Sequence, residues 1–191
     1  MKLANGLSLL RIVLTPVLLV LLLWRPPDYY LLAAIVFLVA VASDMLDGYF
    51  ARRRAAVSKL GVFLDLVADK VLTSSVLVAF VDLEIVPGWP VIVILCREFL
   101  ITGFRTFAAA EGVVVPAAAW GKQKTAITNL AIFVLILQAD FARGGYISRF
   151  GGLGPSLGVA PWLLYLAVVL TVTSGLLYLY SGRALFQRLV G

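Results

Sequence analysis

Four aspartates lie close together in an otherwise apolar sequence, within the stretch SDMLDGYFARRRAAVSKLGVFLDLVADK at residues 43–70. Asp44 and Asp47 are three residues apart, and Asp65 and Asp69 are four residues apart. On a helix, both spacings place the two carboxylates of a pair on the same face. Acidic side chains within membrane helices are costly and mark functional pathways by default. The four carboxylates therefore predict a site at which positive charge offsets their repulsion.

Divalent metal ions are the positive charges that suit this site best. The chain has no histidine, so the available ligands are oxygens, which Mg²⁺, Mn²⁺ and Ca²⁺ prefer. Metal ions clamped between carboxylates are also what phosphoryl chemistry uses. The alternative is a structural network of ion pairs, in which Arg52, Arg53 or Lys70 would supply the cations.

The elements that must position these residues are membrane-spanning helices. Of the 191 residues, 62% are hydrophobic and the mean hydropathy is +1.04, whereas soluble domains are about 45–50% apolar. A helix needs about 20 apolar residues to cross the hydrocarbon layer. We therefore expect an all-α integral membrane protein, a single domain over residues 1–191 with six transmembrane helices. The predicted spans are 8–24, 29–50, 60–80, 89–109, 125–141 and 162–180.

The opening residues, MKLANGLSLLR, are less apolar than the span that follows. They predict either a short N-terminal interfacial helix or the frayed start of the first span. The Gly-rich stretch at residues 142–160 predicts a long outer loop, and no chemistry is legible in it.

Charged loops predict how the chain lies in the membrane. The arginines of the run ARRRAAVSK at residues 51–59 fall between the second and third spans, and positively charged loops stay in the cytoplasm. The two spans then form a hairpin that places the aspartate pairs face to face, below the cytoplasmic surface. We expect a protein of the cell (inner) membrane whose active site faces the cytoplasm. The net charge of +6 does not indicate nucleic acid as a partner, because no soluble basic face exists to bind it.

A second group of charges lies on the fourth and fifth spans. Arg97 and Arg105 fall within the fourth span, and Lys122 and Lys124 precede the fifth. Buried cations call for an anion, and arginine suits bidentate binding of phosphate. We expect these four residues to bind a phosphate group on the acceptor substrate. The alternatives are pairing of the arginines with Glu98, snorkelling to water, and simple anchoring of the lysines at the cytoplasmic side.

Written as a pattern, the aspartate stretch is D-x-x-D-G-x-x-A-R-x8-G-x-x-x-D-x-x-x-D, from Asp44 to Asp69. It resembles the signature of the CDP-alcohol phosphotransferases, in which a CDP-linked donor loses CMP while its phosphoalcohol group passes to a second alcohol. The resemblance implies that the aspartates hold Mg²⁺ or Mn²⁺, two ions in all, and that Asp69 is also the catalytic base. The implied metal ligands are Asp44, Asp47, Asp65 and Asp69. The implied CDP-binding positions are Asp44, Gly48, Ala51, Arg52 and Gly61.

Three further motifs resemble the phosphatidylglycerophosphate synthase branch of that family. They are N-G-L-S-L-L-R at residues 5–11, R-E-F-L-I-T-G-F-R at 97–105 and G-K-Q-K-T at 121–125. The first departs slightly, because threonine is usual where Ser8 stands, although both residues carry a hydroxyl. The resemblance implies CDP-diacylglycerol as donor, sn-glycerol 3-phosphate as acceptor, and a homodimer in the lipid bilayer.

Two rival functions stay open on the sequence. A phosphatidylinositol phosphate synthase of the same family would also need basic residues for a phosphorylated acceptor. A divalent-cation transporter would use the aspartates as ion ligands. A transporter predicts interrupted helices and paired repeats, and the sequence contains neither in recognisable form.

Overall fold

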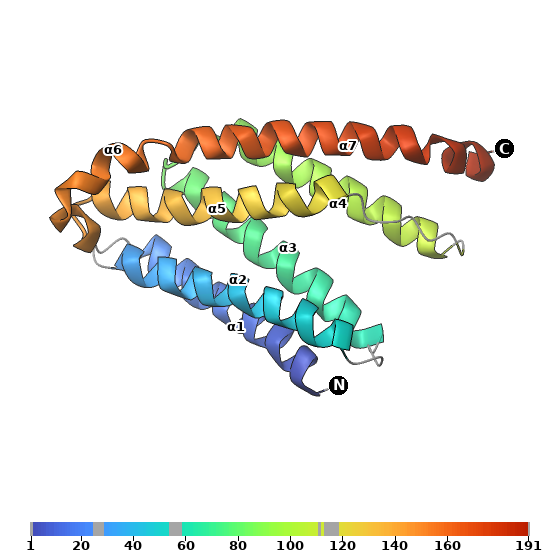
Figure 1. Cartoon of the computed structure of the whole chain (residues 1–191), viewed down its shortest axis with the longest axis horizontal. Coiled ribbons are helices and arrows are strands. Elements are labelled where there is room, and N and C mark those ends of the chain that lie inside the picture. The colour runs from blue at the N-terminus through green and yellow to red at the C-terminus, as the bar shows by residue number, and fades with distance from the viewer. Residues whose placement is uncertain (1, 25–28, 54–58, 111, 113–118, 191) are drawn as a thin grey trace. The chain divides into compact units, whose positions relative to one another are not determined.

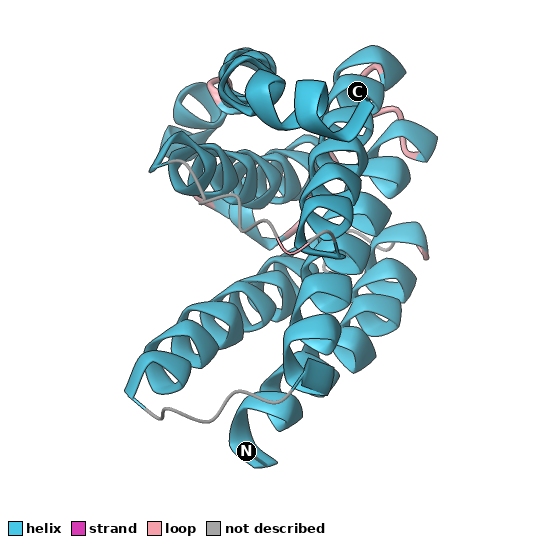
Figure 2. Cartoon of the chain, turned by 90° about the vertical axis from the view of Figure 1, so that its right-hand side faces the viewer, coloured by secondary structure: helices cyan, strands magenta, loops and turns pink. Residues whose placement is uncertain are grey.

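The computed structural model describes residues 2–24, 29–53, 59–110, 112 and 119–190. Side chains are described at 6–24, 29–44, 61, 63–110, 112, 121, 123–152, 154, 156–178 and 180. Figures 1 and 2 show that the described chain is helical, with no strand in it. The predicted all-α class is therefore confirmed. The long helices are α1 (Lys2–Leu23), α2 (Tyr29–Arg53), α3 (Lys59–Asp82), α4 (Gly88–Ala110), α5 (Ala119–Ala142) and α7 (Ala160–Val190).

Each long helix coincides with one predicted span, but not all are equally apolar. Among the described residues, three segments are long and apolar enough to cross a membrane: Gly6–Leu23, Gln123–Ala142 and Ala160–Tyr178. A shorter apolar segment covers Tyr29–Asp44. The charged residues of the predicted sites interrupt the apolar sequences of α3 and α4. These two helices are therefore not among the segments that are apolar enough to cross a membrane by this measure. The count of six spans stays a prediction.

The opening residues belong to the first helix. α1 runs without a break from Lys2 to Leu23 and includes Pro16. Among the described residues, the opening stretch therefore forms no separate helix, and where the first span begins stays a prediction.

The chain divides into two compact units. The first comprises Met1–Val86 and Ile132–Ala160, and the second comprises Pro87–Ala131 and Pro161–Gly191. α5 contributes to both units, because the division falls within it. The single domain expected over residues 1–191 stays a prediction.

The buried face of α1 is polar in the first half of the helix and apolar beyond it, at Leu18 and Leu22. Ser8, Arg11 and Thr15 are buried, whereas Val13 and Val17 are exposed. α1 packs against both α2 and α3 within the first unit. In lipid, an apolar outer face costs nothing, and polar groups must find partners inside the helix bundle. This packing brings the polar face of α1 against the helices that carry the aspartates.

The Gly-rich stretch forms short helices in place of the predicted long loop. These are η1 (Tyr146–Arg149), η2 (Gly151–Leu153) and α6 (Gly154–Leu157). The fully buried carboxylate of Asp140 accepts a hydrogen bond from the backbone N–H of Ile147 at 2.7 Å. A Cβ at Gly154 would lie 2.6 Å from Cζ of Phe141, so the ring would have to shift to admit a larger residue. These contacts tie the stretch to the end of α5.

The second unit contains α4, the first part of α5 and most of α7. Trp89 of α4 stacks on Tyr165 of α7, with ring centroids 5.7 Å apart. Phe104 and Tyr178 make an edge-to-face contact between the same helices at 5.9 Å. Trp89 and Trp162 are exposed near the starts of α4 and α7. Tryptophan at the ends of membrane helices is typical of the membrane interface.

Candidate functional site

The carboxylates of Asp44 and Asp65 meet on one guanidinium group, that of Arg11. NH2 of Arg11 lies 3.0 Å from Oδ1 of Asp44, and NH1 lies 3.4 Å from Oδ1 of Asp65. The arginine side chain is 1% exposed, whereas the two carboxylates are 43% and 51% exposed. One buried cation of α1 therefore holds together an acid of α2 and an acid of α3, and both acids keep an open side.

Local structure places Arg11 at this point. Arg11 lies between Ser8 and Thr15 on the buried polar face of α1. The hydroxyl of Thr15 donates a hydrogen bond to the carbonyl oxygen of Arg11 at 2.9 Å. This bond satisfies the threonine within its own helix and leaves the guanidinium to the two carboxylates.

Asp69 lies one helical turn beyond Asp65 on α3. Its Oδ2 is 3.5 Å from Nζ of Lys70, and its side chain is 35% exposed. The charges of Asp65 and Asp69 both act on Asp44. Three of the four predicted aspartates therefore share one region, as the hairpin of α2 and α3 predicts.

The remaining motif positions are only partly described. Asp47, Gly48, Ala51 and Arg52 lie on α2, but their side chains fall outside the described residues. Gly61 lies in the first turn of α3 and is half-buried.

The described carboxylates provide the type of donor atom that a hard divalent cation prefers. They supply only oxygen donors, from two helices, with part of each carboxylate open. Among the described side chains, no group of three or more His, Cys, Asp or Glu residues that could hold a metal ion is present. Asp47, the fourth predicted ligand, is not in that set. Metal binding therefore stays a proposal.

Ion pairs offset part of the negative charge of the aspartates, which is the alternative to metal ions that the sequence left open. Lys70 pairs with Asp69, as the ion-pair alternative suggested, whereas Arg52 and Arg53 lie outside the described side chains. The main cation is Arg11, which sequence reasoning noted only as part of the opening motif. The signal that could have identified it is the polar series Ser8, Arg11 and Thr15 on an otherwise apolar helix.

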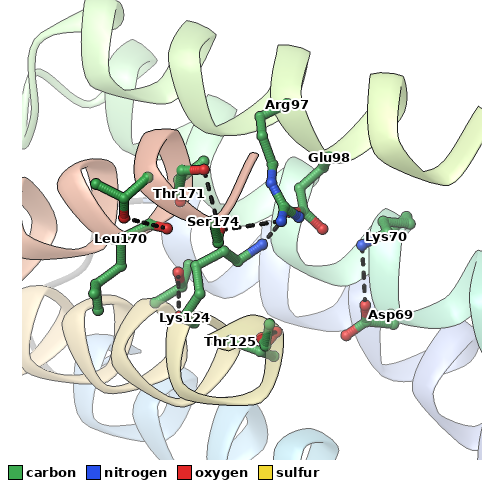
Figure 3. A network of polar contacts seen from close by, with 12 residues as sticks. Asp69, Lys70, Arg97, Glu98, Lys124, Thr125, Leu170, Thr171 and Ser174 are labelled. Atoms are coloured by element: carbon green, nitrogen blue, oxygen red, sulfur yellow. Dashed lines mark hydrogen bonds and ion pairs between the residues drawn. The ribbon is translucent and has the colours of Figure 1, made fainter. Parts of the chain in front are cut away.

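A second polar cluster lies in the second unit and joins α4, α5 and α7. Oε1 of Glu98 accepts hydrogen bonds from NH1 of Arg97, at 3.0 Å, and from Nζ of Lys124. NH2 of Arg97 donates to the hydroxyl oxygen of Ser174 at 3.1 Å. Figure 3 shows these side chains converging from three helices. All three charged side chains are largely buried.

The structure brings together two of the four predicted acceptor residues, Arg97 and Lys124. The pairing of Arg97 with Glu98 is one of the alternatives that the sequence left open, whereas the pairing of Lys124 with Glu98 was not among them. Arg105 is exposed on α4, and no ion pair of Arg105 is found among the described residues. Lys122 lies on α5, with its side chain outside the described set. Sequence reasoning missed Ser174, which carries no motif and lies 77 residues after Arg97.

Comparison with known proteins places these residues in a family context. Residues 1–173 match the family described as CDP-alcohol phosphatidyltransferase. The CDP-diacylglycerol–glycerol-3-phosphate 3-phosphatidyltransferase of Bacillus subtilis (strain 168) is 38% identical over 149 residues, which cover 72% of this chain and 77% of that protein. The protein of the same name from Rickettsia bellii (strain RML369-C) is 31% identical over 185 residues, 97% of each chain. A probable phosphatidylglycerophosphate synthase of Mycobacterium tuberculosis (strain ATCC 25618 / H37Rv) is 33% identical over 187 residues, 96% of this chain and 82% of that protein.

Replacing Arg11 by methionine tests its structural part in the aspartate region. Arg11→Met keeps an unbranched side chain but removes the positive charge that Asp44 and Asp65 share. We expect a loss of about 1–3 kcal/mol in stability, less than for a fully buried pair because both carboxylates are half exposed. Thermal unfolding in detergent, with divalent ions removed by a chelator, measures it. Lys70→Met is the matched control and should have a smaller effect. An Arg11→Met protein as stable as wild type would contradict this account.

Proposed function

Because this chain belongs to the CDP-alcohol phosphatidyltransferase family, we propose that it transfers the phosphatidyl group of CDP-diacylglycerol to sn-glycerol 3-phosphate. The products are phosphatidylglycerol phosphate and CMP. The observation that carries the choice of acceptor is the similarity, over 97% of both chains, to a protein named for this reaction. The alternative acceptor, an inositol phosphate, also carries a phosphate group.

The aspartate region is the proposed centre of the reaction. Asp44, Asp47, Asp65 and Asp69 would hold two Mg²⁺ or Mn²⁺ ions, which offset the negative charge on the diphosphate and on the departing CMP. The half-exposed carboxylates of Asp44 and Asp65 support this assignment, because an acid that served only the Arg11 ion pair would need no open side.

Asp69 is the proposed general base. It removes the proton from the acceptor hydroxyl, whose oxygen then bonds to the phosphorus that carries the diacylglycerol group. The bond from that phosphorus to the CMP oxygen breaks, and CMP leaves with the bonding electrons. The partial exposure of Asp69 leaves its carboxylate accessible to a hydroxyl, which proton transfer requires.

The CDP group is proposed to bind along α2 and the start of α3. Gly48, Ala51 and Gly61 lack bulky side chains, so a ligand can approach the backbone closely. Asp44 and Arg52 complete the proposed set. The helix bounds place Gly48, Ala51 and Arg52 in the last turns of α2 and Gly61 in the first turn of α3.

The acceptor phosphate is proposed to bind the basic cluster of Arg97, Arg105, Lys122 and Lys124. The meeting of Arg97 and Lys124 on one glutamate supports a shared anion site, because their donors already converge. A planar guanidinium suits a phosphate better than an ammonium group does, and the two together neutralise more charge.

The chain is an integral membrane protein by its apolar helices and its family. We propose that it lies in the inner membrane with the active site toward the cytoplasm. The arginine-rich loop would stay on that side, as positively charged loops do, and water-soluble glycerol 3-phosphate would reach the site from there. A homodimer is proposed from the family resemblance alone.

The acceptor is tested by release of CMP from CDP-diacylglycerol. Purified protein with Mg²⁺ or Mn²⁺ should release CMP when sn-glycerol 3-phosphate is added, and should stop when a chelator removes the metal. Inositol phosphate and serine serve as comparison acceptors. Release with either of these, and none with glycerol 3-phosphate, would assign the chain to another branch. Metal uptake into proteoliposomes without CMP formation would support the transporter instead.

The part assigned to Asp69 is tested by Asp69→Asn, which keeps the shape but cannot accept the proton as a carboxylate does. We expect kcat to fall by about 10²–10⁴-fold, the usual contribution of a positioned base, while the protein still folds. Asp82→Asn, at the exposed far end of the same helix, is the matched control and should keep wild-type activity. Retention of activity in Asp69→Asn would remove this residue as the base.

A further inference from the structure

α7 contributes two residues that hold Arg97 in place. The hydroxyl oxygen of Ser174 accepts a hydrogen bond from NH2 of Arg97 at 3.1 Å and donates its own hydrogen to the carbonyl oxygen of Thr171 at 3.2 Å. Because the serine hydrogen points back into α7, a lone pair faces the guanidinium. Ser174 is buried, so water does not compete freely for this bond.

Gly175 leaves the space that the arginine stem occupies. A Cβ at Gly175 would lie 3.2 Å from Cγ and 3.6 Å from Nε of Arg97. The closer of these contacts is tighter than ordinary packing, and Cγ lies near the root of the side chain. A small displacement there moves the guanidinium at the far end by more. Glycine at 175 therefore lets Arg97 lie directly against α7.

The guanidinium of Arg97 keeps donor capacity beyond these contacts. NH1 donates to Glu98 and NH2 to Ser174, whereas Nε is buried without a hydrogen-bond partner among the described residues. A guanidinium has more N–H donors than these two bonds use, and a buried donor without an acceptor is costly. Nε of Arg97 therefore lacks an acceptor oxygen among the described residues, and a phosphate group can supply one.

We propose that Ser174 and Gly175 of α7 are positioning residues for the phosphate of the acceptor, acting through Arg97. The ligand class is a phosphomonoester, and the proposal rests on the function proposed above in taking it to be glycerol 3-phosphate. Both residues lie beyond residues 1–173, the segment that matches the family. Ser174 sets the direction of the guanidinium, Gly175 sets its depth against α7, and Glu98 holds it beside Lys124.

Ser174→Ala and Gly175→Ala test the proposal. Each should raise the KM for glycerol 3-phosphate about tenfold, the effect of disturbing a hydrogen bond to a charged group. We expect kcat and the KM for CDP-diacylglycerol to stay within about twofold of wild type, because neither residue is assigned to the donor or to the reacting atoms. The selective rise in one KM is a change that a general loss of stability would not produce.

Two matched controls lie on the same two helices. Thr173→Ala removes an exposed hydroxyl whose hydrogen bonds, among the described residues, stay within α7 and reach the carbonyl oxygens of Val169 at 2.8 Å and Leu170 at 3.3 Å. Gly103→Ala adds a methyl group on α4 where nothing lies within 4 Å. Both controls should keep the wild-type KM for glycerol 3-phosphate.

A second measurement separates this proposal from the function proposed above. The rise in melting temperature caused by inorganic phosphate or by glycerol 3-phosphate reports binding without catalysis. We expect it to be smaller in Ser174→Ala and Gly175→Ala than in wild type and in the two controls. Unchanged KM values and unchanged stabilisation in both variants would overturn the proposal. A wild-type protein that is stabilised by phosphate but releases no CMP with glycerol 3-phosphate would instead overturn the proposed acceptor, and the proposal would hold if the variants lost that stabilisation.

Discussion

The ion pairs that Arg11 makes with Asp44 and Asp65 are the interaction on which the arrangement of the first unit depends. Carboxylates from neighbouring helices repel each other, and the repulsion is stronger where water is scarce. A guanidinium can contact two carboxylates at once, because its N–H groups point in several directions in one plane. α1 therefore supplies the positive charge, on Arg11, that lets α2 and α3 bring their carboxylates together. One side of each carboxylate stays exposed.

The same rule governs the second unit. In a membrane, polar side chains gain by facing one another inside the helix bundle, and apolar side chains can face the lipid at no cost. Arg97, Glu98, Lys124 and Ser174 obey this rule across α4, α5 and α7. Each unit thus has a polar cluster built around one arginine, which is buried in the first unit and largely buried in the second. In the first unit, Arg11 contacts both Asp44 and Asp65. In the second unit, Glu98 contacts both Arg97 and Lys124.

Local spacing was enough to predict the helices that carry the aspartates. It could not predict the partner of these aspartates, because Arg11 lies 54 residues before Asp65 and the contact arises only when α1 packs on α3. Ser174 was missed for the same reason, since nothing in its neighbourhood distinguishes it from a serine in any membrane helix. The Gly-rich stretch was predicted as a loop because its order depends on buried contacts with Asp140 and Phe141, which composition does not contain.

The central claim is that Asp44, Asp47, Asp65 and Asp69 enclose divalent metal ions next to Arg11. Anomalous diffraction from crystals grown with Mn²⁺ tests it most directly, because the signal locates manganese independently of any assumed reaction. The account predicts two anomalous peaks bounded by these four carboxylates, and their loss in crystals of Asp65→Asn. Manganese bound elsewhere, or carboxylates turned away from one another with no ion between them, would contradict it.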